Sequence, residues 1–242
     1  AALPSAQKIG LDMISGVEFS SVHQGTSVHV LAYSFSLDSP AITVFCAEHQ
    51  KRREQRIGEM LLLLNKHGMP IQESELYAAR GTKRGIGRPH LAQAMVKKGY
   101  VKDTHTAFKL YIGEGKPCYS LGKPNTIEET FDCIRQANGF VVLAHPHLID
   151  NTAVLKSLLN MPFDGIECFY ARFSKQQNQR WVDIAKKKEW LMLGGSDFHG
   201  AMKPAIELGS SWTPQETFDV LWKRFQANNS HKNFQNKEPR EN

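Results

Sequence analysis

The segment Leu-Gly-Gly-Ser-Asp-Phe-His-Gly, from Leu193 to Gly200, constrains the fold of this chain more than any other. The apolar residues that lead into it, from Trp190 onward, predict a buried strand that ends at the glycines. Asp197 and His199 follow where the strand gives way to a loop, so both side chains can converge on one point. Parallel α/β enzymes place their chemistry at the carboxyl ends of strands, so the segment favours an α/β fold with a site at that edge.

A second apolar run, residues 140–144, ends in the same kind of side chain. The run is continuously apolar, as expected of a strand buried on both faces, and His145-Pro146-His147 follows it. Because proline stops the strand, we expect His145 at the carboxyl end, on the same edge as the Asp-x-His pair. We expect His147 to lie outside the metal shell.

An N-terminal hairpin supplies two further candidate ligands. Residues 14–20 and 28–33 have the composition of strands, with a turn predicted at Gln24-Gly25. Pairing of the two segments would bring Glu18 and His29 together. Carboxylates and imidazoles are suitable ligands for Mn²⁺, Zn²⁺ or Fe²⁺. The sequence therefore predicts one divalent-metal set from four extended segments: Glu18, His29, His145, Asp197 and His199.

The composition favours an enzyme that is not embedded in a membrane. The 242 residues carry a net charge of +6, which favours anionic substrates such as phosphates. No apolar run is long enough to span a bilayer, and no secretory signal is visible. The four cysteines are scattered without a Cys-x-x-Cys pair, which predicts reduced thiols and a cytoplasmic location. Neither a membrane nor an obligate protein partner is expected.

Helices and strands alternate along most of the chain. Helices are predicted at 3–9, 40–66, 89–98, 104–112, 126–139, 153–159, 174–188 and 214–225, and a further strand at 165–169. Thr126-x-x-Glu129 is a capping box at one helix start. The expected domains are a β/α barrel from residues 1–52 and 123–227 and an inserted helical subdomain, 53–122, without strands. Residues 228–242 are expected to form a disordered tail.

Five short motifs carry a resemblance to a known family. They are Gly-Val-Glu-Phe-Ser at 16–20, Val-His-Val-Leu-Ala-Tyr at 28–33, Gly-Arg-Pro-His at 87–90, Leu-Ala-His-Pro at 143–146 and Gly-Ser-Asp-Phe-His at 195–199. In this order they resemble the PHP-domain metallophosphoesterases, in the branch of nucleoside 3′,5′-bisphosphate phosphatases and 5′-to-3′ exoribonucleases. The resemblance implies a distorted β/α barrel with an inserted helical domain. It also implies two or three divalent ions, manganese above all, with zinc, iron or magnesium as alternatives.

The chain departs from this family pattern at its start. Family members begin with a strand carrying His-x-His and a second strand ending in Thr-Asp-His-Asp, and neither motif occurs here. We therefore expect a barrel lacking its first two strands, with the strands of Glu18 and His145 each short of a neighbour. The surviving ligand positions are intact, which favours a segment of a longer protein over a degraded copy.

The resemblance implies hydrolysis of nucleotide phosphate esters by a metal-activated water. The substrate would be a nucleoside 3′,5′-bisphosphate or the 5′ end of a short RNA. Asp197 and His90 are the expected catalytic residues. Arg88 and His90 are expected to bind a phosphate beside a helix N-terminus, although a solvent-exposed loop also explains them. Glu167, at the end of the predicted strand 165–169, is expected either to support that strand or to face the site and support its ligands.

Two other functions remain open. One alternative is a catalytically inactive module that binds a nucleotide or RNA and has lost half of its metal site. A phosphatase of the histidinol-phosphate type is a third possibility, but the long helical insert argues against it.

Overall fold

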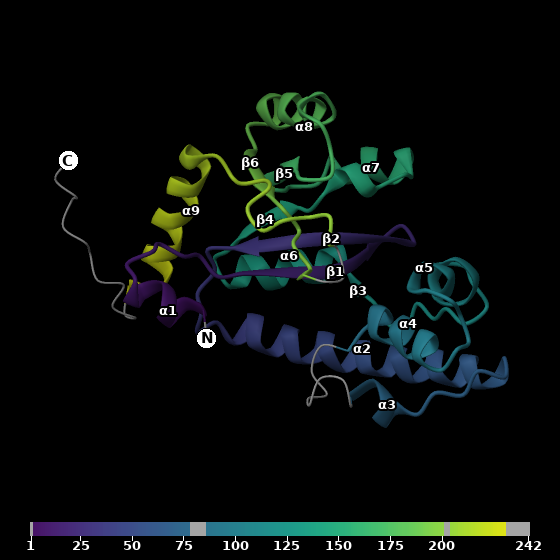
Figure 1. Cartoon of the computed structure of the whole chain (residues 1–242). Coiled ribbons are helices and arrows are strands. Elements are labelled where there is room, and N and C mark those ends of the chain that lie inside the picture. Colours follow the sequence, from purple (N-terminus) through teal and green to yellow (C-terminus); the bar gives the residue numbers. More distant parts are fainter. Residues whose placement is uncertain (1, 78–85, 201–203, 231–242) are drawn as a thin grey trace. The chain divides into compact units, whose positions relative to one another are not determined.

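A six-stranded mixed sheet is built from the two ends of the chain, as the computed structural model shows for the described residues 2–77, 86–200 and 204–230 (Figure 1). The strand order is β3-β1-β2-β4-β5-β6. The strands are β1 (Gly16–His23), β2 (Thr26–Tyr33), β3 (Asn125–Thr126), β4 (Phe140–Leu143), β5 (Gly165–Tyr170) and β6 (Leu191–Gly195). The predicted hairpin and the three predicted apolar strands are all present.

Strand directions place several strand ends at one edge of the sheet. The hairpin strands β1 and β2 are antiparallel, and β2 is also antiparallel to β4. The strands β4, β5 and β6 run parallel to one another, so their carboxyl ends lie at the same edge. The segments that carry the predicted ligands after β4 and β6 therefore start from one side of the sheet.

The helices agree with the sequence patterns to within a few residues. The predicted capping box forms at the start of α6, where Thr126 and Glu129 each bond the other's backbone N–H. The predicted helix 104–112 is a short α-helix followed by a π-turn, η1. The helical elements are α1 (Ala2–Lys8), α2 (Pro40–Lys66), α3 (Glu73–Tyr77), α4 (Arg88–Lys97), α5 (Thr104–Ala107), η1 (Phe108–Ile112), α6 (Ile127–Gln136), η2 (Pro146–Leu148), α7 (Thr152–Leu158), α8 (Lys175–Lys188) and α9 (Gln215–Asn228).

The chain divides into two compact units. The first comprises residues 1–43 and 125–242 and holds the sheet, and the second comprises residues 44–124. The described residues of the second unit form helices without strands around a core that includes Met60, Leu64, Leu91 and Met95. The predicted insertion, 53–122, lies within this unit, and its role as an insertion into a barrel stays a prediction.

Three helices pack against the sheet of the first unit. The helix α6 packs against β1, β2 and β4, whereas α8 packs against β5 and β6. Leu221 of α9 joins Val142 and Leu193 in a buried cluster that also contacts Leu31. Because directly paired residues of adjacent antiparallel strands point to the same side of a sheet, Glu18, whose Cα pairs with that of Leu31, lies on the same face as Leu31.

Two expectations are wrong, namely that β1 and β4 each lack a neighbour and that the disordered tail starts at residue 228, whereas the absence of two barrel strands stays a prediction. The strands β1 and β4 are internal, because β1 pairs with both β2 and β3, and β4 pairs with both β2 and β5. The predicted disordered tail begins too early: Asn228 ends α9, and Asn229 is fully buried. The rest of that predicted tail, from residue 231, lies outside the described residues. Within the described ranges, each helix is too short or too polar to cross a membrane.

Replacing Asn229 with alanine should destabilise the first unit. Its side-chain oxygen accepts from the Leu37 N–H at 2.8 Å, and its amide donates to the carbonyls of Phe35 and Phe225 at 3.1 and 2.9 Å. Alanine would leave these buried backbone groups unpaired, so we expect a loss of about 2–4 kcal/mol in the free energy of unfolding. Urea denaturation measures it, and Lys223→Ala, on an exposed position of α9, is the control. Equal midpoints for the two variants would contradict this role.

Candidate metal centre

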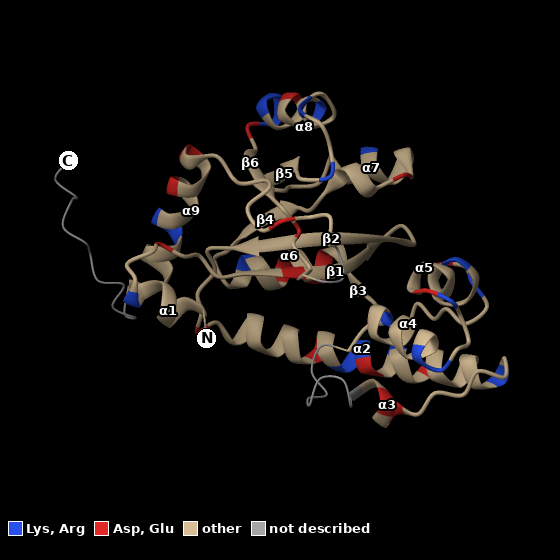
Figure 2. Cartoon of the chain, viewed as in Figure 1, with Lys and Arg blue, Asp and Glu red and all other residues tan. Residues whose placement is uncertain are grey.

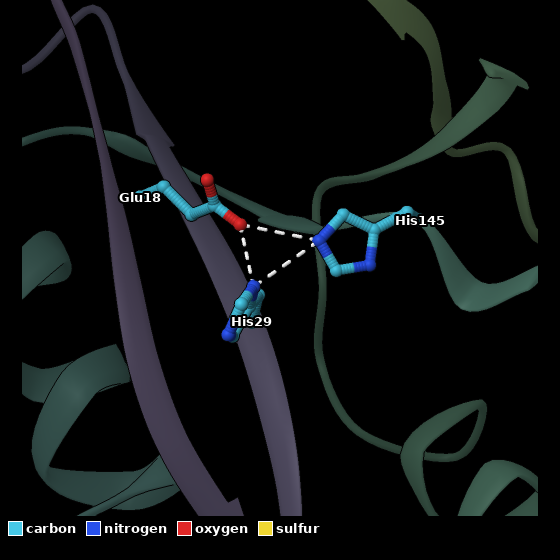
Figure 3. A group of neighbouring side chains, drawn as sticks. All are labelled: Glu18, His29 and His145. Carbon is cyan, nitrogen blue, oxygen red and sulfur yellow. Dashed lines mark hydrogen bonds and ion pairs between the residues drawn. The ribbon is translucent and has the colours of Figure 1, made fainter. Parts of the chain in front are cut away.

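A glutamate and two histidines from three segments of the sheet point at one another (Figure 3). Glu18 Oε1 lies 2.6 Å from Nδ1 of His29 and 3.1 Å from Nε2 of His145, and these two nitrogens are 3.2 Å apart. Among the described His, Cys, Asp and Glu side chains, this group has the proximity that a shared metal ion requires. The structure therefore brings together three of the five predicted ligands.

Strand register explains why Glu18 and His29 meet. Glu18 pairs with Leu31 and Ser20 pairs with His29, so the glutamate and the histidine are diagonal neighbours on one face of the hairpin. His145 comes from the end of β4, where its backbone has a φ of 23°. Positive φ is uncommon outside glycine and marks a conformation that the surrounding structure imposes.

The three side chains are strongly coupled electrostatically. Burial alone would raise the pKa of Glu18, but hydrogen bonds from His145 and His29, with their charges, hold it well below its usual range. Burial alone would lower the pKa of His145, but the hydrogen bond and charge of Glu18, helped by Glu167 and Asp197, raise it. The carboxylate thus remains an anion at neutral pH, as a metal ligand must.

The donor set fits a divalent metal ion. Ligand atoms about 2.1 Å from one ion lie roughly 3–3.5 Å apart. Two of the three separations here, 3.1 and 3.2 Å, are in this range, and the separation between Glu18 and His29, 2.6 Å, is shorter. Two imidazoles and a carboxylate match the preferences of Mn²⁺, Zn²⁺ and Fe²⁺. Nδ1 of His145 is buried without a hydrogen-bond partner among the described residues, but so is Nδ1 of His147, so this feature does not distinguish a metal ligand from a packing histidine.

Asp197 and His199 form a separate pair after β6. Nδ1 of His199 lies 2.7 Å from the Asp197 carbonyl and 3.3 Å from its Oδ1. A carbonyl only accepts, so Nδ1 carries the proton and Nε2 of neutral His199 keeps a lone pair for a ligand. Neither residue belongs to the compact group around Glu18, although the charge of Asp197 contributes to the raised pKa of His145.

Backbone geometry accounts for the glycines before Asp197. A Cβ at Gly194 would lie 2.4 Å from the carbonyl oxygen of Trp212, so the close approach of that loop requires glycine. Asp197 itself has a φ of 50°, a left-handed conformation that aspartate tolerates better than most residues. The Gly-Gly-Ser-Asp sequence is therefore fitted to a tight exit from β6.

Glu167 has a larger role than the sequence indicated. It lies in β5, is 7% exposed, and its Oε2 accepts the backbone N–H of His145 at 2.8 Å. Burial raises its pKa to about 7, although the hydrogen bond from His145 opposes the shift. Its place in a strand was predicted from the sequence, but the adjacency of that strand to β4 and the contact with the His145 backbone were not.

His147 is a packing residue. Its ring lies against those of Tyr170, Phe173 and Trp181, and its Nε2 bonds Oδ1 of Asn178 at 2.9 Å. Burial lowers its pKa to about 4, so the ring is neutral at pH 7. The expectation that it lies outside the metal shell agrees with this environment.

Arg88 and His90 begin α4 in the second unit. The guanidinium of Arg88 lies over the rings of Phe108 and Tyr119, with its carbon 5.7 and 5.6 Å from their centroids. Arg56 stacks on the same Tyr119 ring at 5.2 Å. Burial lowers the pKa of Arg88, and the charge of Arg56 adds to this effect.

Sequence reasoning missed the basic partners of Arg88. Arg56 and Arg53 lie on α2, and the terminal nitrogen of Arg53 closely approaches the Gly87 backbone. Figure 2 shows Lys and Arg along α2 and α4 of the second unit, and on α8 of the first. Only the fold brings residues 53 and 56 to residue 88.

Comparisons with known proteins find relatives that match most of the chain. The chain is 31% identical over 228 residues to the 5′-3′ exoribonuclease Rnm of Salmonella typhimurium, covering 88% of this chain and 76% of that protein. It is 25% identical over 231 residues to the 3′,5′-nucleoside bisphosphate phosphatase of Chromobacterium violaceum, covering 93% and 81%. No protein-family profile matches the chain.

A solved structure extends the likeness to three dimensions. A Bifidobacterium adolescentis protein described as a metal-dependent phosphoesterase superposes with a TM-score of 0.79 at 27% identity. The match covers 92% of this chain and 80% of that one. Together with the motif order, these findings confirm the resemblance: the chain belongs to the PHP-domain metallophosphoesterases, a family of metal-dependent hydrolases, in the branch that includes exoribonuclease Rnm.

Proposed function

We propose that this protein hydrolyses phosphate esters of nucleotides, either nucleoside 3′,5′-bisphosphates or the 5′ ends of short RNA. The observation that carries the proposal is the convergence of Glu18, His29 and His145 within hydrogen-bond distance at one edge of the sheet. The names of the two curated relatives support nucleotide and RNA substrates. The net charge of +6 suits such anions.

The metal site would draw on both groups of side chains. Glu18, His29 and His145 would hold one ion, and Asp197 with His199 would complete the set for two or three ions, manganese above all. When bound, the ions supply an acidic water and stabilise charge on the attacking and leaving oxygens. Asp197 contributes the negative charge, and Nε2 of His199 the lone pair that its Nδ1 hydrogen bond leaves available.

Glu167 supports this set through the backbone. By accepting the N–H of His145 it fixes the start of the loop that carries the imidazole. Its burial makes that constraint rigid. The barrel expected for the family, with the helical unit as an insertion, is part of the proposal.

The second unit would bind the substrate phosphate. Arg88 lies at the N-terminus of α4, where backbone N–H groups favour anions, and Arg53 and Arg56 add positive charge. His90 accepts the Gly87 N–H at Nδ1 (3.2 Å), so its Nε2 carries the proton. We assign His90 the role of a general acid that donates this proton to the leaving oxygen.

Arg88→Ala should raise KM about 10- to 100-fold, because a charge-assisted hydrogen bond to phosphate is lost. The kcat should change less if Arg88 binds ground state and transition state alike. Steady-state kinetics on a nucleoside 3′,5′-bisphosphate measures both constants. Arg180→Ala, which removes an exposed guanidinium stacked on Trp181, is the matched control and should be silent. If Arg88→Ala changes neither KM nor kcat, the proposed role of the second unit in substrate binding is wrong. The proposed metal site would not be affected by that result.

The function itself is tested by phosphate release. We expect Mn²⁺-dependent release from a nucleoside 3′,5′-bisphosphate or from 5′-phosphorylated RNA, abolished by a chelator and restored by Mn²⁺. A chain that binds the nucleotide but releases no phosphate with any of Mn²⁺, Zn²⁺, Fe²⁺ or Mg²⁺ would instead be the inactive binding module.

A further inference from the structure

Tyr170 joins the two groups of candidate ligands. It is the last residue of β5, which lies between β4 and β6 in the sheet. The side chain is fully buried, and its hydroxyl donates to Oδ2 of Asp197 at 2.8 Å. The residues that it separates, His145 and Asp197, follow the carboxyl ends of the two flanking strands.

The ring of Tyr170 is held from several sides. Its centroid is 5.8 Å from that of His145, and the rings of His147 and Phe173 are each at 5.8 Å as well. A ring fixed by such packing presents its hydroxyl at a defined point. One rigid side chain therefore contacts the imidazole of one group and the carboxylate of the other.

The hydrogen bond from Tyr170 links the loop of Asp197 to the sheet. Asp197 lies in a loop beyond β6 with a left-handed backbone. His199, which also contacts Asp197, is on the same loop, and its side chain is 41% exposed. A bond from a buried strand residue thus restrains the carboxylate relative to the sheet, which His199 cannot do.

We propose that Tyr170 is a positioning residue that fixes the Asp197 carboxylate relative to His145 and so sets the separation of the two halves of the metal centre. The inference rests on the proposed metal site. Partners of metal ligands in other proteins contribute about 10- to 100-fold to metal affinity, and Tyr170 would act in this way.

Tyr170→Phe tests the inference, because it removes the hydroxyl and keeps the packed ring. We expect Mn²⁺ affinity, measured by calorimetry with the metal alone, to fall about 10- to 100-fold. Tyr100→Phe is the matched control: it removes a tyrosine hydroxyl that donates to the Pro70 carbonyl in the second unit. Affinity in the control should equal that of the wild type.

A double-mutant cycle with Asp197→Asn separates positioning from general destabilisation. If Tyr170 acts through the Asp197 carboxylate, Tyr170→Phe should have little further effect on Mn²⁺ affinity in the Asp197→Asn background. Losses of Mn²⁺ affinity that add up in the double variant would overturn the inference. So would an unchanged Mn²⁺ affinity in Tyr170→Phe together with a thermal midpoint that this substitution lowers equally in both backgrounds. Wild-type affinity in Tyr170→Phe, with Asp197→Asn impaired, overturns this inference alone. Unchanged affinity in Asp197→Asn overturns the proposed metal site as well.

Discussion

Asp197→Asn is expected to reduce Mn²⁺-dependent phosphate release by about 10²-fold or more. The amide keeps the shape of the side chain but loses the charge that would hold the ion. Mutation of residues that only support a metal ligand already reduces metal affinity or activity about 10- to 100-fold. Removing the charge of a ligand itself should reduce activity at least as much. The loss should appear mainly in kcat, since the proposed contact of Arg88 with the substrate phosphate is unchanged.

A matched control distinguishes this effect from the loss of any carboxylate. Asp219 of α9 accepts a hydrogen bond from Gln215 at 2.8 Å on the exposed side of its helix. Asp219→Asn makes the same chemical change and should leave phosphate release at the wild-type rate. Full metal-dependent activity in Asp197→Asn would show that the site assignment is wrong, because no other group in the proposal takes over that charge.

The local structure of this chain was largely predictable from sequence. The continuous apolar run at 140–144 predicted a buried strand, which is observed at Phe140–Leu143, and Thr126 with Glu129 could be recognised as a cap. The hairpin followed from alternating residues around Gln24-Gly25, and its register then placed Glu18 diagonally from His29. Each of these inferences depends on residues within about a dozen positions of one another.

The contacts that complete the site were not predictable in the same way. Tyr170 and Asp197 are 27 positions apart, and their hydrogen bond depends on β5 lying beside β6. Arg56 and Arg88 meet on Tyr119 only because the second unit folds α2 against α4 and the segment that follows η1. Glu167 looked like an ordinary strand residue because its partner is a backbone N–H, which every residue has.

The strand order was also beyond the sequence. We expected β1 and β4 to lack neighbours, because the family pattern predicts strands that this chain does not contain. In the structure the two-residue strand β3 pairs with β1 at Ser21 and Val22, and β5 pairs with β4. A two-residue strand leaves almost no periodic signal, so its pairing could not be anticipated.

Glu18→Gln should remove the Mn²⁺ affinity of the group around it, by about 10²-fold or more. Glu18 supplies the negative charge of that group, and its carboxylate accepts from both histidines. Glutamine is isosteric but neutral, so the two imidazoles would be left to hold the cation alone. Calorimetry with Mn²⁺ measures the loss, and Glu128→Gln, at an exposed position of α6, provides the control.

Thermal denaturation gives a second measure of the same variant. An ion present at about 100 times its dissociation constant stabilises the folded state by about 2.7 kcal/mol, so Mn²⁺ should raise the melting temperature of the wild type. That increase should disappear in Glu18→Gln. Without metal the two proteins should melt within a few degrees of each other, because the Glu18 side chain is 37% exposed and such ion pairs contribute about 1 kcal/mol or less. A Mn²⁺-dependent increase that survives in Glu18→Gln would place the ion elsewhere, whereas a large loss without metal would make Glu18 a structural residue.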